Sequence, residues 1–323
     1  MSNKSLGLGA AFFAIFAIGF AMSSCHDADT TPVIVVDDDD ALAEAELLHP
    51  PAPARQPGVY YFGFDLRSSP QEDAAQYLPF LRYLEEATGL RFKLHFAANS
   101  SATSDDLGLD RTQFAAMGAV SFLRANDQYG AISIARGLNE KNKATYRSVF
   151  AVSPESPLTE ISQLRGRRLA FGSSDSTQGH LIPRIELRQN AISLDELDSY
   201  FFTNSHESAA EAVVSGRADA AALQDTLAER LASEGRIKII HYSDEYPSSS
   251  IVANASVPED VIQLVTQALI AFDPSGDHGE NLYNWDRTEM PNGFQRSTYE
   301  DYRELHEWLV ELDLWQQLRE QAD

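Results

Sequence analysis

The sequence predicts an α/β protein built from two lobes, each with a sheet flanked by helices. From Gly58 onward, short runs of β-forming residues alternate with amphipathic helical segments. The alternation restarts near residue 152 and runs to about 245, so this region can form a lobe inserted into a first lobe made of both chain ends. The 323 residues, 43% of them hydrophobic, are ample for one large core or two modest ones.

In the first part of the chain, strands are indicated by runs of apolar, aromatic and β-branched residues. They are expected at Val59–Phe64, Arg91–Phe96, Gln113–Met117, Ala131–Ala135 and Tyr146–Val152. The periodic or polar segments between them predict helices at Asp73–Thr88, Asp105–Asp110 and Val120–Asn126. Gly89 ends the first of these helices.

The second part continues the alternation. Its strands are expected at Arg168–Phe171, Tyr200–Thr203, Ala218–Ala222 and Ile237–His241. Its helices are expected from Ser176 through Arg188, at Ser208–Ser215 and at Thr226–Ser233. Pro183 should kink or shorten the first of them, because proline cannot donate within a helix. From Val257 the pattern is helical, most clearly over Tyr299–Leu314.

This order divides the chain into 57–150 plus 248–323 for lobe 1, and 151–247 for lobe 2. Two crossover strands, near 148–153 and 245–252, would join the lobes in the layout of a type II periplasmic binding protein. Ligands of open α/β sheets bind at the carboxyl ends of strands. Here that places the ligand in a central cleft between the lobes.

The N-terminus predicts export and a lipid anchor. Residues 1–25 carry Lys4 and then an apolar run up to Met22, which is typical of a signal peptide. Met22-Ser23-Ser24-Cys25 resembles a bacterial lipobox, with Met in place of the usual Leu, so Cys25 is the expected lipidation site. An uncleaved anchor helix is the alternative. Residues 26–56, acidic and rich in proline, predict an extended tether.

The charge excludes some partners. The formal net charge is −23, from 48 acidic and 25 basic residues. Nucleic-acid binding depends on cationic side chains at phosphates, and docking to anionic lipids depends on basic patches. Neither partner is expected.

A Ser-Thr pair at a helix start indicates an anion site. Ser176, Thr177 and Gln178 follow a buried strand and open a helix, whose first N–H groups lack intrahelical partners and lie at the positive end of its dipole. A tetrahedral oxyanion could accept several of these donors. The alternative is a plain N-cap that serves stability alone.

Four stretches together resemble the phosphate, phosphite and phosphonate substrate-binding family of ABC transporters. They are Tyr61–Leu90, Leu158–Gly179, Ser205–Asp219 with its His206, and Asn292-Gly293-Phe294 with Tyr299 and Tyr302. The resemblance implies an ABC importer's solute-binding protein that captures a phosphonate-type oxyanion and delivers it to a permease complex. It also implies that His206 contacts phosphoryl oxygens; the alternative is a surface histidine that caps its helix. We expect a monomer that is not an enzyme and needs no cofactor.

The chain departs from the family at three places. Gln178 replaces the second serine of a Ser-Thr-Ser-Gly turn. Pro247-Ser248-Ser249-Ser250 stands where relatives carry an acidic residue, and Ser249 is our candidate ligand residue there. An aromatic residue near Asn99–Ser101 is missing. These departures favour a bulkier or different ligand, or loss of binding.

Two other functions remain as alternatives. An orphan sensory or scaffolding lipoprotein would keep the fold with an altered or decayed site. An exported hydrolase could use Ser176, His206 and an acid, but Ser176 lacks the Gly-x-Ser-x-Gly elbow. The eight histidines show no His-Glu-x-x-His motif, and no metal site is expected.

Overall fold

The computed structural model describes most of the chain after the tether. The described residues are 58–65, 70–97, 100–203 and 205–320. The predicted signal peptide (1–25), Cys25 and the tether (26–56) lie outside the described residues, as does Asn99. None of the described helices is long and apolar enough to cross a membrane.

One sheet has six strands and takes them from both ends of the described chain. In spatial order they are β13 (Phe294–Arg296), β4 (Ile132–Gly137), β12 (Ser250–Ala253), β3 (Phe114–Met117), β1 (Val59–Asp65) and β2 (Arg91–Ala97). β1 pairs in parallel with β2 and β3, whereas β12 runs antiparallel to β3 and β4. The parallel pairs place the carboxyl ends of β1 and β3 at the same edge of the sheet.

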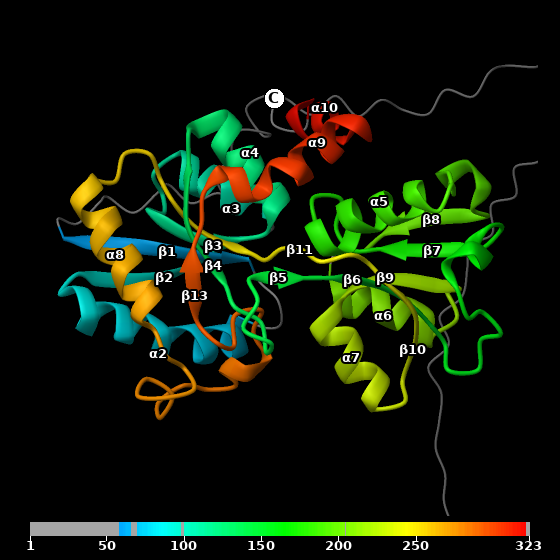
Figure 1. Cartoon of the computed structure of the whole chain (residues 1–323), viewed down its shortest axis with the longest axis horizontal. Helices are drawn as coiled ribbons and strands as arrows, with labels where there is room; N and C mark the ends of the chain where they lie inside the picture. The colour runs from blue at the N-terminus through cyan, green and yellow to red at the C-terminus, as the bar shows by residue number, and fades with distance from the viewer. Residues whose placement is uncertain (1–57, 66–69, 98–99, 204, 321–323) are drawn as a thin grey trace, which may run out of the picture. The chain divides into compact units, whose positions relative to one another are not determined.

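The other sheet has five strands, all from the middle of the chain. In spatial order they are β10 (Lys238–Tyr242), β6 (Ser148–Val152), β9 (Ala220–Gln224), β7 (Arg168–Phe171) and β8 (Ser199–Phe202). A two-stranded ladder joins β5 (Thr145–Tyr146) to β11 (Tyr246–Pro247), where the chain passes between the sheets (Figure 1). The two sheets and two connecting strands confirm the predicted two-lobe α/β fold. Because β6 begins at Ser148, the second sheet starts slightly before the predicted lobe boundary at 151.

Helices flank both sheets (Figure 1). The α-helices are α2 (Pro70–Thr88), α3 (Ser100–Gly108), α4 (Ala119–Tyr129), α5 (Ile182–Gln189), α6 (His206–Val214), α7 (Asp225–Ser233), α8 (Glu259–Ala271), α9 (Arg303–Glu311) and α10 (Leu314–Glu320). The shorter turns are η1 (Ile161–Leu164), η2 (Thr177–Leu181), η3 (Leu194–Glu196), η4 (Trp285–Arg287) and η5 (Tyr299–Tyr302).

Aromatic packing fills the core of the six-stranded sheet. Phe62 is fully buried, stacks on Phe64 and meets Phe80 of α2 edge-on. Phe80 in turn contacts Phe272 and Trp285 from the C-terminal part of the chain. Each such ring buries a large apolar area, so these contacts tie the chain's two ends into one core.

The structure corrects one expectation for the C-terminal part and refines another near η2. The segment after Val257 was expected to be helical, but Phe294–Arg296 form β13, which pairs with β4. Three residues carry too little periodicity to show a strand, and the pairing with β4 decides it. Near η2, Pro183 occupies the first turn of α5, and the five residues before α5 form a π-turn instead of an α-helical start. The proline thus shortens the helix, as predicted.

Candidate functional site

The candidate site begins where β7 ends and the chain folds back on itself. Gly172 N donates to Gly179 O at 2.8 Å. A Cβ atom on Gly179 would lie 2.9 Å from Gly172 Cα and 2.9 Å from Ser176 Oγ. Only glycine fits here, because contacts this short do not occur between real side chains and backbone. The two glycines therefore fix η2 tightly against the carboxyl end of β7.

Ser176 caps this turn. Its Oγ accepts from Gly179 N at 2.9 Å, and its carbonyl oxygen accepts from both His180 N and Leu181 N at 3.1 Å. Ser176 is thus an N-cap in the structure. It accepts hydrogen bonds from three backbone amides, which are therefore not available to a ligand. Within the described chain, no hydrogen bond uses the N–H of Thr177 or Gln178. These two amides are the donors that remain for an anion.

Thr177 brings a second helix start to the same place. Its Oγ1 accepts from Val120 N at 3.0 Å, in the first turn of α4. Gly118 permits this approach, since a Cβ there would lie 3.0 Å from Thr177 Oγ1. The N-terminal ends of α4 and η2, which flank different sheets, therefore meet at one threonine. Both ends carry partial positive charge from their unpaired N–H groups.

Tyr146 completes this group, and sequence reasoning missed it. Its side chain is 5% exposed, and the hydroxyl lies near Thr177 and Ala119 but forms no hydrogen bond of acceptable geometry with any described residue. Burial, followed by the negative charge of Glu289, raises the pKa of Tyr146 well above its ordinary value, so the hydroxyl keeps its proton. A buried tyrosine hydroxyl normally finds a partner. In the sequence, Tyr146 was only the first residue of an apolar strand.

His206 lies next to this turn. It is the first residue of α6, and its Nδ1 accepts from Gln224 N at 3.2 Å. In the neutral ring the proton is therefore on Nε2. The ring approaches Gly179, since a Cβ there would be 3.0 Å from His206 Cε1. The structure thus brings the predicted histidine to the start of η2.

Gln178 is positioned differently from the other two residues of its turn. Its Nε2 donates to Arg147 O at 2.9 Å and to Asp225 Oδ1 at 3.2 Å. Its backbone oxygen accepts from Ser148 Oγ at 2.7 Å. The amide, longer than the serine it replaces in the resemblance, reaches Asp225 and holds that carboxylate.

Ser249 contacts an acidic residue and not the η2 turn. Its hydroxyl donates to Glu289 Oε2, which comes from the segment between η4 and β13. Glu289 therefore lies next to the 247–250 segment, which contains no acidic residue of its own. Nothing in the sequence indicated this, because the two residues are 40 positions apart.

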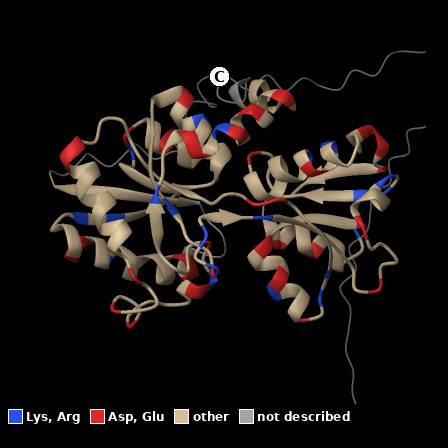
Figure 2. Ribbon diagram, in the orientation of Figure 1, with Lys and Arg blue, Asp and Glu red and all other residues tan. Residues whose placement is uncertain are grey.

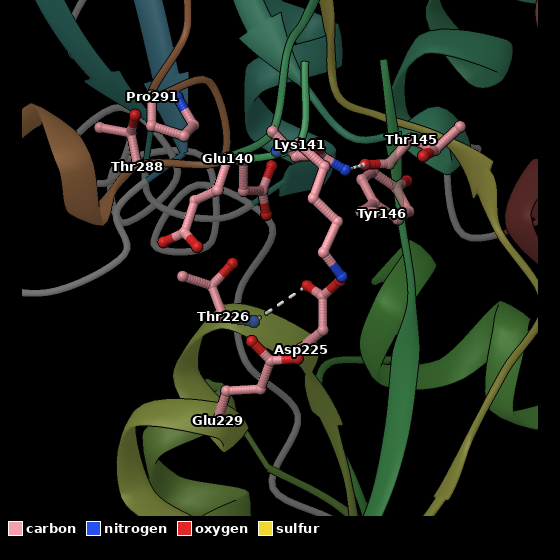
Figure 3. A pocket seen from close by; sticks show the side chains of 11 residues that line it. Glu140, Lys141, Thr145, Tyr146, Asp225, Thr226, Glu229, Thr288 and Pro291 are labelled. Carbon is pink, nitrogen blue, oxygen red and sulfur yellow. Dashed lines mark hydrogen bonds between the residues drawn. The ribbon is translucent and has the colours of Figure 1, made fainter. Parts of the chain in front are cut away.

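An acidic cavity adjoins Tyr146. It has a volume of about 70 Å³ and is lined by three segments of the chain: 139–146, the start of α7, and 288–291. Figure 3 shows Glu140, Asp225 and Glu229 around this space, with Lys141 extending across it. Burial, reinforced by Glu289 and Glu229, raises the pKa of Asp225 to about 6, against the opposing hydrogen bonds from Arg147 N and Thr226 N.

A second, apolar cavity of about 110 Å³ is lined by the C-terminal end of η2. Its lining includes His180, Phe202 of β8, and Leu314 and Leu318 of α10. His180 Nδ1 lies 2.6 Å from Ser174 O, while its buried Nε2 has no hydrogen-bond partner among the residues that the structure describes. Burial lowers the pKa of His180 to about 4, so the ring is neutral.

Asp219 lies outside the ligand group, and its carboxylate accepts from Arg168 N, Nε and Nη2 at 2.9 to 3.2 Å. Among the described residues, no three or more His, Cys, Asp or Glu side chains are grouped so that they could hold a metal ion.

Comparison with known proteins identifies the family. Residues 62–302 match the family model described as "ABC transporter, phosphonate, periplasmic substrate-binding protein". The chain belongs to this family. Its members are substrate-binding components of transporters, and the family is not an enzyme class.

Individual relatives agree with the family assignment. The phosphonates-binding periplasmic protein of Escherichia coli is 26% identical over 66% of this chain and 66% of its own length. A probable phosphite-binding ABC transporter protein of Prochlorococcus marinus is 30% identical over 46% of each chain. The matched region thus spans less than two thirds of each curated relative.

Solved structures of phosphonate-family proteins share the fold. The Prochlorococcus marinus PhnD1 protein in complex with methylphosphonate aligns with a TM-score of 0.71 and 20% identity, over 80% of this chain and 99% of that one. A binding-protein component of a Pseudomonas aeruginosa phosphonate transporter aligns with a TM-score of 0.67 and 19% identity, over 77% and 85%. At these identities the likeness shows the two-lobe binding-protein fold.

Proposed function

We propose that this protein is the solute-binding component of an ABC importer and that it captures a phosphonate-type oxyanion beside Thr177. One observation carries the proposal: hydrogen-bond donors from two helix starts and a buried tyrosine gather here. The donors are the N–H groups of Thr177 and Gln178, the Thr177 and Tyr146 hydroxyls, and the first N–H of α4 at Ala119.

The chemistry favours an oxyanion over a neutral guest. A tetrahedral oxyanion offers several acceptor lone pairs, and preorganised amides at helix starts stabilise negative charge. His206 can add a donor from Nε2, since its Nδ1 is already an acceptor. No lysine or arginine is required, which suits a chain with a net charge of −23.

The proposal also includes the location and state of the protein. The predicted signal peptide and Cys25 support an exported, lipid-anchored protein, and the transporter family supports delivery of the ligand to a membrane permease. We propose that the protein acts as a monomer. Palmitate labelling of the wild-type chain, lost in Cys25→Ala, tests the anchor. An orphan sensory or scaffolding role is not favoured, because the family consists of transporter components.

Calorimetric titration with phosphate, phosphite, methylphosphonate and larger phosphonates tests the binding proposal. At least one oxyanion is expected to bind. Tyr146→Phe should weaken it about tenfold or more, because a hydrogen bond to a charged group contributes about 1.5–3 kcal/mol. Thr177→Val should act in the same direction.

Tyr200→Phe serves as the matched control, since Tyr200 is 44% exposed on the edge strand β8. Its hydroxyl should not matter for binding. The proposal fails if the folded protein binds none of these oxyanions, or if Tyr146→Phe and Tyr200→Phe bind equally well.

A further inference from the structure

One apolar cluster of the protein draws on both lobes. It contains buried residues of α4, α9 and α10, which belong to the lobe of the six-stranded sheet. It also contains Leu181 at the end of η2 and Ile182 and Ile185 of α5, which belong to the lobe of the five-stranded sheet and are at most 1% exposed. The other three apolar clusters of the described residues each stay within one lobe. The lobes are therefore packed against one another as well as connected by the chain.

The apolar cavity of about 110 Å³ lies inside this contact. Leu181 and Phe202 line it from the lobe of the five-stranded sheet, and Leu309, Leu314 and Leu318 line it from α9 and α10. We call these five side chains the interlobe seam. Its four leucines are buried. Separating the lobes along the seam would expose these leucines to water, which is unfavourable.

The seam lies at one end of the turn that carries the proposed oxyanion site. η2 begins at Thr177, whose Oγ1 accepts from Val120 N at 3.0 Å, and it ends at Leu181 in the seam. Val120 also lines the apolar cavity. Because Ser176 and Gly179 hold η2 in one compact turn, we expect the turn to move as a unit. A motion that takes Thr177 away from α4 therefore also takes Leu181 away from α10.

Charge contributes little to this contact. Arg188 Nε of α5 lies 3.8 Å from Glu311 Oε1 of α9, a helix that is rich in acidic side chains (Figure 2). The two side chains are 68% and 54% exposed. An ion pair so open to solvent adds little to stability. The seam thus depends on apolar burial.

The covalent connections leave the angle between the lobes adjustable. β5 and β11 join in a ladder of only two residue pairs, Tyr246 with Tyr146 and Pro247 with Thr145. A few residues at the ends of elements are the usual hinge for domain closure. The balance between open and closed lobes then depends on non-covalent contacts, and the seam is such a contact.

We propose that the interlobe seam positions η2 against α4 and holds the lobes closed before any ligand arrives. Its effect on affinity rests on the proposed oxyanion site, whereas its effect on the lobes needs no ligand. A ligand that binds only the closed form has an apparent affinity proportional to the fraction of molecules that are closed. Leu314 and Leu318 are thus positioning residues, which raise the affinity for the oxyanion without touching it.

Pyrene labels across the seam measure its closure directly. Cys25, the single cysteine of the chain, is removed in Cys25→Ala, and the labels are attached to Arg188→Cys and Glu311→Cys, two exposed sites that lie close together. Two pyrenes emit as an excimer only when they are in contact. The ligand-free protein with an otherwise wild-type seam should give strong excimer emission. Methylphosphonate should change this emission by less than about 1.5-fold, because the closed form already predominates.

Leu318→Ala weakens the seam. Without ligand, its excimer emission should fall at least about twofold, and calorimetry on the unlabelled variant should show methylphosphonate binding about fivefold or more weakly. Leu318→Met, which nearly keeps the side-chain volume, should restore both. Leu269→Ala is the matched control, since Leu269 of α8 is buried in a cluster of one lobe. It should lower the stability but keep emission and affinity within about twofold of wild type.

The outcomes separate this inference from the proposed function. Weak ligand-free emission that rises when methylphosphonate is added overturns the closed resting state and leaves the oxyanion site standing. Equal weakening of binding in Leu318→Ala and Leu269→Ala, or none in Leu318→Ala, also overturns the inference. Strong ligand-free emission that is lost in Leu318→Ala, with no oxyanion bound by the folded wild type, supports the seam and overturns the proposed function. The emission of the protein with an intact seam needs no truncated leucine, so the test holds even if a variant fails to fold.

Discussion

The acidic cavity and the apolar cavity differ in what burial does to the pKa of their ionisable residues. In the acidic cavity, burial raises the pKa of Asp225 to about 6, and neighbouring carboxylates reinforce the shift. In the apolar cavity, burial lowers the pKa of His180 to about 4. Burial favours the uncharged form of both side chains. It therefore raises the pKa of an acid such as Asp225 and lowers the pKa of a base such as His180.

The neighbours of the two residues give the cavities different roles. Asp225 faces other acids and a tyrosine hydroxyl without a partner, an arrangement that a ligand could complete. His180 lines its cavity together with Phe202, Leu314 and Leu318. The imidazole ring of His180 contacts the rings of Phe171 and Phe202 edge-on. The apolar cavity is thus part of the packing of η2 against α10. The comparison shows that burial of an ionisable residue beside a cavity does not by itself mark a binding site.

The largest expected effect comes from disturbing η2, which lines the apolar cavity and contacts Asp225 of the acidic cavity through Gln178. Gly179→Ala should cost about 3 kcal/mol of unfolding free energy, because the new methyl group meets Gly172 Cα at 2.9 Å. Urea unfolding measures this cost. The matched control is Gly63→Ala in β1, whose nearest contacts would be 3.4 Å, and it should change stability by less than about 1 kcal/mol. Similar costs for both variants would show that η2 is not tightly fixed.

His180 should make the protein sensitive to acid. Its folded pKa lies below that of a free histidine, so the unfolded chain binds the proton first, and stability is lost as the pH falls from 6.5 toward 4. The loss should be about 2 kcal/mol between pH 7 and 4.5. His180→Asn, which can still donate to Ser174 O, should lack this loss. Parallel acid dependence in wild type and variant would contradict the lowered pKa.

Asp225 should act in the opposite direction. Its folded pKa lies above that of a free aspartate, so the folded state binds the proton first, and its charge costs stability as the pH rises through 6. Relative to wild type, Asp225→Asn should gain about 1 kcal/mol between pH 5 and 8. The substitution also removes hydrogen bonds, but that loss of stability is the same at every pH. It therefore drops out when the change in unfolding free energy with pH is compared between the two proteins. If the difference in unfolding free energy between Asp225→Asn and wild type stayed constant from pH 5 to 8, the pKa of Asp225 would not be raised.

The smallest effect concerns the coupling inside the acidic cavity. Because the charge of Glu289 raises the pKa of Asp225, Glu289→Gln should lower that pKa. Carbon-13 chemical shifts of the Asp225 carboxyl group follow its titration directly. Glu307→Gln should leave the titration unchanged. An upward shift, or none, in Glu289→Gln would mean that the two carboxylates do not face one another.

The family and most of the fold could be read from the sequence. β-Forming runs such as Val59–Phe64 and periodic segments such as Asp73–Thr88 gave strands and helices close to β1 and α2, because local pattern and burial agree there. The four family-like stretches pointed to the same family that the comparison shows. β13 was missed because its three residues become a strand only by pairing with β4.

The candidate site was predicted only where its chemistry is local. Ser176, Thr177 and Gln178 signalled a helix start by themselves, since capping depends on adjacent residues. Tyr146 and Glu289 gave no signal, because their importance depends on partners far away in sequence. Gln178 was counted with the anion donors, yet its side chain turns to Asp225.

By itself, then, the sequence determined the alternation of elements, the excess of negative charge and the presence of donors at 176–178. Tertiary structure decided that the start of α4, Tyr146 and two carboxylates from different lobes meet at that point. The physical reason is the sequence separation of the interacting residues. Hydrogen-bond donors at a helix start depend on neighbours along the chain, whereas the charge around them depends on residues that are distant in sequence and close only in the folded protein.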